Sequence, residues 1–306
     1  MRRALPLLSI LLLAPAAQAW NVTGHEIVAA IAYDDLKANH PKTLAKIIAI
    51  LKAHPLPEMI GNQVKRLDAP ADQQDKALFM TAARFPDDVR MKAGIKGYSH
   101  PTWHYVDFPL SRKGDSTTGP QPDQPNALSA LAGQLTVLTG DNPDKDKAVA
   151  VCWVAHLVGD LHQPLHAVSM YAKDLPKAGD RGGNDTYVRF GTKKTIRLHS
   201  LWDGLLGTDY EFKPASAIAT ELEHRPDFAP DKIPEASELD AKVWAKASFD
   251  IARKVAYLDA TLPAAREDAG TVLPDTYGKD AKSVAERQVV LAGRRLSAVL
   301  VKGIGD

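Results

Sequence analysis

The sequence has few cysteines, no long apolar run and no excess of charge of one sign, and each of these features excludes a class of protein or of interaction. It has a single cysteine, Cys152, so no intramolecular disulfide can form, and stability must come from core packing or bound metal. Its apolar run at residues 7–13 is shorter than the roughly 20 residues that a membrane-spanning helix needs. Charge of one sign is also lacking, because 38 Lys and Arg face 37 Asp and Glu. Strong general attraction to long duplex nucleic acid is therefore not expected, and any such substrate must be held locally.

Residues 1–19 have the pattern of a secretory signal peptide. Two arginines follow the initiating methionine, an apolar segment comes next, and residues 17–19 form an A-x-A cleavage site. We therefore predict that this segment is removed and that the mature chain begins at Trp20. Losing two arginines leaves 36 basic against 37 acidic residues, so the formal net charge changes from +1 to −1. An exported chain without disulfides favours a bacterial enzyme of the periplasm or the medium.

Residues 20–306 predict a single, mainly α domain with a small β-hairpin. Apolar residues recur at helical spacing between polar loops, with no repeat, coiled-coil register or domain linker. Thr23 is the expected N-cap of the first helix, whereas residues 61–75 are polar and unpatterned. The hairpin is predicted from residues 186–190 and 195–198. Further helices are predicted at 44–51, 128–138, 215–223, 241–258 and 281–301, with another that opens at 142–143.

The stretch from Val154 to His166 organises the rest of the chain. On a helix, His156 and Asp160 stand one turn apart on the same face, so both can reach one metal ion. Pro164 removes a backbone donor and should end the helix, which redirects His166 toward a second ion. The stretch therefore predicts a hydrolytic site with more than one zinc ion.

The other histidines differ in their surroundings. His199 and Asp203 repeat the one-turn spacing, and His25 and His104 lie among apolar or aromatic residues, where an imidazole needs a partner. Together they would supply enough nitrogen and oxygen ligands for several zinc ions. For any single pair, a salt bridge or a satisfied core histidine is the alternative. We expect His162 to lie in the core or to support a ligand. Three other histidines are expected at the surface: His40, His54 and His224.

Seven motifs follow one another along the chain: Trp20-Asn-Val-Thr-Gly-His25, Phe85-Pro-Asp87-Asp-Val-Arg90, Trp103-His104-Tyr-Val-Asp107, His156-Leu-Val-Gly-Asp160, Gln163-Pro-Leu-His166, Gly182-Gly-Asn184 and Leu198-His-Ser-Leu-Trp-Asp203. In this order they resemble the zinc-dependent S1/P1 single-strand nucleases, or nuclease/3′-nucleotidases. The fold of that family is similar to the fold of bacterial zinc phospholipase C. The resemblance extends to the C-terminal helix and, as a set of motifs, is highly specific.

The resemblance implies three zinc ions, two of which share Asp160 as a bridging ligand. The other implied ligands form three sets: Asp87, His104 and His156; the α-amine and carbonyl of Trp20 with His25; and His166, His199 and Asp203. Removal of the signal peptide then has a chemical role, because only a free amine at Trp20 can donate its lone pair to zinc.

The resemblance also implies the reaction, which is hydrolysis of single-stranded RNA and DNA to 5′-nucleotides, with 3′-nucleotidase activity. A zinc-bridging hydroxide would attack phosphorus, oriented by Asp87, while Arg90 would offset charge on the phosphoryl group. A surface ion pair with a neighbouring aspartate is the alternative for Arg90. Tyr105 would stack on the base 5′ to the cut and Asp107 would accept from base N–H donors, with Asn184 nearby. A monomer without a membrane anchor is expected.

Departures from the family pattern bear on the substrate. Arg197 stands where family members often have asparagine, and residues 171–180 form a polar insertion beside the implied site. A phospholipase C-like enzyme is one alternative, although that group places Glu where this chain has Asp203. A non-catalytic zinc carrier is another, although carriers usually use an exposed His-rich tract, which this chain lacks.

Overall fold

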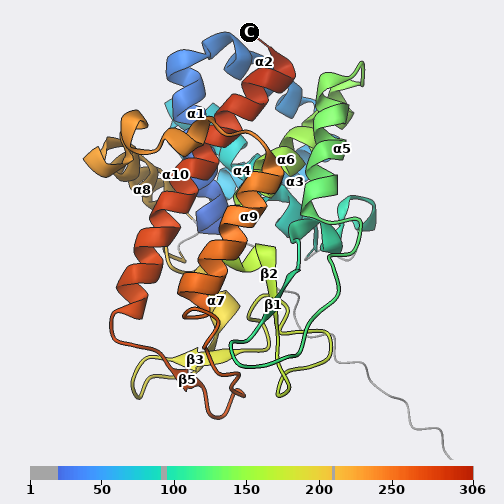
Figure 1. Cartoon of the computed structure of the whole chain (residues 1–306). Coiled ribbons are helices and arrows are strands. Elements are labelled where there is room, and N and C mark those ends of the chain that lie inside the picture. The colour runs from blue at the N-terminus through green and yellow to red at the C-terminus, as the bar shows by residue number, and fades with distance from the viewer. Residues whose placement is uncertain (1–19, 91–94, 209–210, 306) are drawn as a thin grey trace, which may run out of the picture.

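The computed structural model describes residues 20–90, 95–208 and 211–305, and Figure 1 shows their arrangement. The predicted signal peptide lies outside the described residues. Helices dominate and the strands are few and short, which confirms the predicted mainly α fold. In the three described segments, no helix combines the length and the apolar character that crossing a membrane requires.

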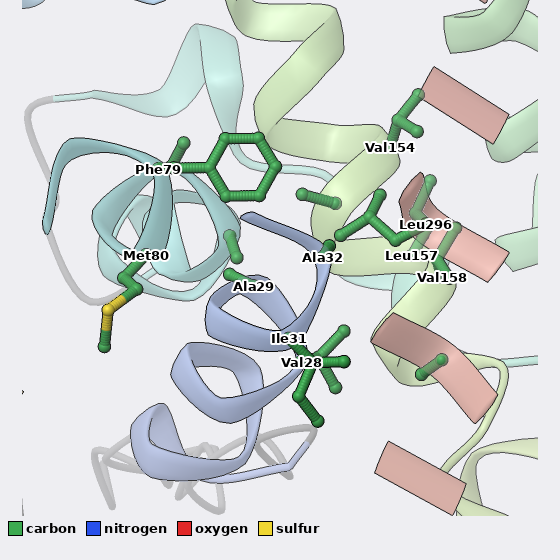
Figure 2. Close-up of a cluster of buried hydrophobic side chains, with 14 of the residues drawn as sticks. Val28, Ala29, Ile31, Ala32, Phe79, Met80, Val154, Leu157, Val158 and Leu296 are labelled. Carbon is green, nitrogen blue, oxygen red and sulfur yellow. The ribbon is translucent and has the colours of Figure 1, made fainter. Parts of the chain in front are cut away.

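Four long helices form the centre of the molecule: α1 (Val22–Asn39), α4 (Gln74–Arg90), α6 (Asp144–Asp160) and α10 (Tyr277–Ile304). Their apolar faces meet in one core, where Figure 2 shows Phe79 of α4 and Leu157 of α6 among side chains of α1 and α10. Both residues are fully withdrawn from water. Burial of apolar surface on this scale fixes how α1, α4 and α6 lie against one another, and these three helices carry much of the site.

Helices α5 (Ala127–Thr139), α6 and α9 (Ala241–Ile251) begin close to the predicted residues, whereas α10 begins at Tyr277, earlier than the predicted 281, and the cap of α1 differs from the prediction. Asn21 caps α1, because its side-chain oxygen accepts a hydrogen bond from the N–H of Gly24 at 3.1 Å. Thr23, the predicted cap, lies inside the first turn, so that prediction was wrong by two residues. Helix α6 follows Pro143 as predicted, and Asp144 in its first turn complements the helix dipole.

Shorter helices surround this centre: α2 (Pro41–Lys52), α3 (Pro57–Arg66), α5 (Ala127–Thr139), α7 (Leu198–Asp203), α8 (Phe212–His224) and α9 (Ala241–Ile251). Helix α3 was not predicted, because its buried face offers only a few residues, such as Met59 and Ile60, in an otherwise polar stretch. The helix predicted at 241–258 ends earlier, where a π-helical turn follows α9.

Single turns connect these helices. The π-helical turn is η8 (Ala252–Ala256), and the others are 3-10 turns: η1 (Ala71–Gln73), η2 (Lys96–Tyr98), η3 (Pro101–His104), η4 (Pro164–Ala167), η5 (Pro226–Phe228), η6 (Pro230–Lys232) and η7 (Pro234–Ser237). Two of them, η3 and η4, carry histidines of the site. Pro101 begins η3 and Pro164 begins η4, and each proline presets the backbone angle that its turn needs.

Two small sheets lie below the helices in Figure 1. Strand β1 (Phe108–Ser111) pairs in parallel with β2 (Val168–Tyr171). Strand β3 (Tyr187–Arg189) pairs antiparallel with β4 (Ile196–Arg197), which confirms the predicted hairpin, and in parallel with β5 (Thr271–Val272). A second hydrophobic core, which includes Trp202, Tyr257 and Tyr277, lies at this end of the molecule.

Candidate metal centre

Three groups of buried side chains lie close enough to hold metal ions. The paired clusters share His156 and comprise His25, His156 and Asp160, and Asp87, His104 and His156. The third cluster comprises His166, His199 and Asp203. Within each group the candidate ligand atoms lie within 4.8 Å of one another. The structure thus brings the predicted histidine and aspartate ligands into these three groups, with His156 close to His25 as well as to Asp87 and His104. The assignment of each ligand to an ion stays a prediction.

Asp160 stands between the paired clusters. Its Oδ1 lies 3.4 Å from Nε2 of His25, and its Oδ2 lies 3.1 Å from Nε2 of His156 and 3.3 Å from Nδ1 of His104. Asp160 is the last residue of α6, one turn after His156, as the sequence spacing predicts. Each carboxylate oxygen therefore faces a different set of imidazoles, which is the arrangement that a bridging ligand requires.

Backbone carbonyls fix which nitrogen of His156 is free. Its Nδ1 lies 2.8 Å from the carbonyl oxygen of Ala83, and since a carbonyl only accepts, Nδ1 must carry the proton. The Nε2 lone pair then points at Nδ1 of His104, 2.8 Å away. A cation beside these two nitrogens and the Asp87 carboxylate would engage all three groups. Such carbonyl support is typical of metal-binding histidines.

In the third cluster, backbone carbonyls fix the free nitrogen of both histidines. His166 donates from Nδ1 to the carbonyl of His104 at 2.6 Å, and His199 donates from Nδ1 to the carbonyl of Gly182 at 2.7 Å. Their Nε2 atoms lie 3.2 Å apart, so two lone pairs of neutral rings face each other. Oδ2 of Asp203 lies 3.5 Å from Nε2 of His199. A cation among these atoms converts a repulsive contact into coordination.

Gln163 completes the third cluster. Its amide nitrogen donates to Oδ1 of Asp203 at 2.8 Å, and its amide oxygen accepts from the N–H of Leu165 at 2.6 Å. The second contact caps η4, so α6 ends at Asp160 and Pro164 opens a separate turn, in line with the prediction that Pro164 redirects His166. The remaining oxygen of Asp203 is left for the cluster.

The chemistry of the donor set fits zinc. Both ring nitrogens of His25, Nε2 of His104 and both carboxylate oxygens of Asp160 are buried without a hydrogen-bond partner in the described part of the chain. Burial lowers the pKa of His25 to about 4 and raises the pKa of Asp160 to about 6. Burying neutral imidazoles beside carboxylates that lack hydrogen-bond donors costs folding free energy, and a divalent cation bound between them would offset that cost. Imidazole and carboxylate groups are also the usual nitrogen and oxygen ligands of zinc.

Trp20 is predicted to bind zinc through its backbone amine and carbonyl, so it does not belong to the three groups of side chains. It is fully buried and lies against Gly24, one residue before His25. The next residue, Asn21, donates its backbone N–H to the carbonyl of Asp203 at 3.4 Å. The backbone at the predicted mature terminus therefore lies among the metal-binding elements, and ligation by Trp20 stays a prediction.

Arg90 lies beside the paired clusters. Its Nη1 is 3.4 Å from Oδ1 of Asp87, and its side chain is only 10% exposed, so the ion pair exists but is not a surface pair. The adjacent Asp88 is taken by Arg84, which also pairs with Glu26 of α1. Arg90 thus supplies a largely buried positive charge next to a candidate ligand.

A pocket of about 310 Å³ lies near η3, and Tyr105 and Asp107 line it together with the loop at 120–126. Tyr105 is 37% exposed, so its ring is available as a stacking face. Burial, with nearby Asp180 adding to it, raises the pKa of Asp107 to about 7. Asn184 does not line this pocket, because its side chain turns to the carbonyl of Arg181 at 2.8 Å.

The histidines outside the clusters divide as follows. His162 lies in the core as predicted, donating to the carbonyl of Val158 and accepting from Arg295, both at 2.7 Å. His224 is exposed. His54 is only 4% exposed and packs against Phe85 of α4, so its prediction as a surface residue was wrong. The sequence pattern around His54 shows the helix end but not the tertiary contact that covers it.

Comparison with known proteins gives a consistent result. A family model described as S1/P1 Nuclease matches residues 20–304. Endonuclease 4 of Arabidopsis thaliana is 31% identical over 163 residues, 49% of this chain and 49% of that protein, and Endonuclease 3 of the same plant is 30% identical over 163 residues, 49% and 50%. The matched region thus spans about half the length of these relatives. Endonuclease 2 is 25% identical over 316 residues, 97% of this chain and 94% of that protein.

Proposed function

This chain belongs to the S1/P1 nuclease family, and from that premise we propose that it is an exported, three-zinc nuclease. Its substrates are single-stranded RNA and DNA, which it cleaves to 5′-nucleotides, and it also removes the phosphate of 3′-nucleotides. The observation that carries the proposal is Asp160, whose two oxygens each face a different set of neutral imidazoles. This arrangement suits a pair of neighbouring ions better than a structural site.

The residues that would hold the ions are those of the paired clusters and the third cluster. The amine and carbonyl of Trp20 would complete the set around His25. When bound, zinc supplies Lewis acidity, which polarises a phosphate oxygen and lowers the pKa of a coordinated water. The carboxylate of Asp87 would orient the attacking water by accepting a hydrogen bond from it.

Arg90 supports the phosphate during the reaction. Its guanidinium lies against Asp87 and is largely shielded from solvent, so its charge acts at short range and is weakly screened. Guanidinium groups bind phosphate oxygens through parallel hydrogen bonds, which strengthen as charge develops on the phosphoryl group. Arg90 therefore stabilises the transition state more than the bound substrate.

The pocket at Tyr105 and Asp107 receives the base next to the cut. Stacking on an aromatic face tolerates any base, and Asp107 accepts from base N–H donors when it is ionised. Unpaired bases reach such a pocket without the cost of melting a duplex. The pocket thereby favours single strands with little sequence preference.

Three measurements on the exported protein test the proposal together: N-terminal sequencing, zinc analysis, and a hydrolysis panel of single-stranded RNA, single-stranded DNA, a 3′-mononucleotide and phosphatidylcholine. We expect a Trp20 terminus, three zinc ions per chain and cleavage of the three nucleotide substrates. Hydrolysis of phosphatidylcholine alone would establish the phospholipase alternative. Three ions without any phosphoester hydrolysis would establish the zinc carrier.

The role of the Trp20 amine has a separate test. A variant whose processing leaves one extra residue before Trp20 has an amide in place of the free amine, and an amide nitrogen has no lone pair to donate. We expect this variant to bind one zinc ion fewer than the correctly processed protein. Equal zinc content in the two forms would remove Trp20 from the ligand set.

A further inference from the structure

Asp180 lies outside the metal clusters and is fully buried in the second hydrophobic core region. Its Oδ1 accepts from the N–H of Met170 at 2.8 Å, and its Oδ2 accepts from the hydroxyl of Thr186 at 2.9 Å and of Tyr257 at 2.8 Å. A buried carboxylate persists only when such donors surround it. Asp180 therefore ties β2, the loop that ends at Thr186 and the segment around Tyr257 into one unit.

Tyr257 reaches Asp180 because the helix before it changes form. Turn η8 replaces α-helical geometry after α9, and the N–H of Tyr257 bonds the carbonyl of Ala252 at 2.8 Å. The next three residues have positive φ angles of 50°, 56° and 60°, in the left-handed region that side chains other than glycine rarely adopt: Leu258, Asp259 and Ala260. Both π-helical turns and strained residues of this kind are concentrated at functional sites.

The loop that Asp180 anchors holds His199 at two points. Gly182 accepts from Nδ1 of His199 at 2.7 Å, and the carbonyl of Gly183 accepts from its backbone N–H at 3.2 Å. Gly182 has a φ of 63°, and a Cβ there would lie 2.3 Å from the carbonyl oxygen of Leu165. The loop can therefore take this path only with glycine, and its carbonyl decides which nitrogen of His199 is free.

We propose that Tyr257 and Asp180 are positioning residues for the third metal-binding cluster, acting through the Gly182 carbonyl on the ring of His199. The inference rests on the proposed function, because it requires an ion at His199. The hydroxyl of Tyr257 fixes Asp180, Asp180 fixes the loop, and the loop keeps the Nε2 lone pair of His199 aimed at His166 and Asp203. In the paired clusters, by contrast, the ring of His156 donates to the carbonyl of Ala83, which lies within the long helix α4.

Tyr257→Phe is the decisive variant, because it removes only the hydroxyl and leaves the ring in the core. Zinc retained by the purified protein is counted during competition with a chelator, and the free energy of unfolding is measured alongside. Groups that orient a metal ligand typically contribute about 10- to 100-fold to metal affinity, so we expect at least tenfold weaker retention of one ion. Ser248→Ala is the matched control, because it deletes a buried hydroxyl that donates to the carbonyl of Leu161 at 2.6 Å and has no bond to Asp180.

A double variant identifies the ion that is lost. His199→Ala should release one ion, and Tyr257→Phe combined with His199→Ala should release no further one. If the double variant releases a second ion, Tyr257→Phe loosens the protein generally and the inference is overturned. Unchanged zinc retention in Tyr257→Phe also overturns it. Thr186→Val, which removes another donor to Asp180, provides the same test if Tyr257→Phe does not fold.

The proposed function and this inference fail in different ways. If His199→Ala retains as much zinc as the unaltered protein, no ion binds at the third cluster and the proposed three-zinc site is wrong. If His199→Ala loses an ion while Tyr257→Phe and Thr186→Val both keep it with unchanged affinity, only the inference is wrong.

Discussion

The paired clusters and the third cluster use the same kinds of side chain but are built on different supports. The paired clusters draw four of their five candidate ligands from α1, α4 and α6, three long helices packed in the main core, and only His104 from the single turn η3. The third cluster draws its ligands from the single turn η4 and from α7, which has six residues. Packing of long helices places ligands directly, whereas short elements need hydrogen bonds to hold them.

The two kinds of support predict that different substitutions will disturb the two regions. In the paired clusters, a defect arises mainly from the loss of a ligand, because the helices remain packed without it. In the third cluster, a change in a residue that touches no metal should suffice, since Gln163 and the Gly182 carbonyl fix Asp203 and His199. The predictions below test this contrast, beginning with the largest expected effect.

Loss of His156 should be the most damaging single change. Its Nε2 supplies one lone pair beside Asp87 and the bridging Asp160, so His156→Ala should release the ion that this nitrogen would hold and weaken the neighbouring ion. The third cluster should stay occupied, and nuclease activity should fall to background. Zinc analysis and hydrolysis of a single-stranded oligonucleotide measure the two effects. The exposed His224→Ala serves as control and should behave like the unaltered protein. Retention of all three ions by His156→Ala would contradict the assignment.

Gln163→Leu should affect the third cluster alone. The substitution keeps the side-chain volume similar but removes the donor to Asp203, and we expect about 10- to 100-fold weaker binding of one ion. The matched control is Gln288→Leu, which removes a buried amide that donates to the backbone carbonyl of His162 at 2.9 Å and not to the side chain of a candidate ligand. Equal loss of zinc in the two variants would show that the third cluster is no more dependent on its support than the others.

Tyr105→Ala should separate substrate binding from both metal regions. Stacking contributes about 1 to 3 kcal/mol per base, so KM for a single-stranded oligonucleotide should rise roughly tenfold while the zinc content stays unchanged. Tyr105→Phe keeps the aromatic face and should leave KM near its original value. A change in zinc content in either variant would mean that the pocket and the metal centre are not independent.

The smallest expected effect concerns His54, which backs the helix that carries Asp87. Burial lowers the pKa of His54 from 6.5 to about 4, so the folded protein holds it neutral. Between pH 6.5 and 4 the unfolded chain binds a proton at His54 and the folded protein does not. The free energy of unfolding is therefore highest above pH 6.5 and decreases as the pH falls toward 4. Denaturant unfolding at several pH values should show a loss on the order of 1 kcal/mol. In His54→Gln, this part of the pH dependence should disappear.

The sequence predicted the parts of the molecule that depend on local spacing. His156 with Asp160, and His199 with Asp203, stand one turn apart in sequence and in space, and α5 and α6 begin and end near the predicted residues. Assignment of His25, His104 and His166 to particular groups came from the family motifs, because ligands from distant segments have no spacing rule.

What the sequence did not predict depends on tertiary contacts. The pairing of β1 with β2 joins strands of four residues about 60 positions apart, and β5 has two residues, too few for a periodic pattern. His199 is supported by the backbone carbonyl of Gly182. Every residue has such a carbonyl, so the sequence gives no sign of this contact. Tyr257 reads as an ordinary helical aromatic until the π-helical turn places its hydroxyl on Asp180.

The position of Asp160 between the paired clusters has a thermodynamic consequence for assembly of the metal centre. Two neighbouring ions that share this carboxylate cannot bind as independent events, because the first ion orders and deprotonates a group that the second requires, while their like charges oppose each other. By linkage, whatever factor the first ion applies to the affinity of the second, the second applies equally to the first. Filling and emptying of the paired clusters should therefore follow a cooperative curve, with half-filled protein rare or abundant according to the sign of that coupling.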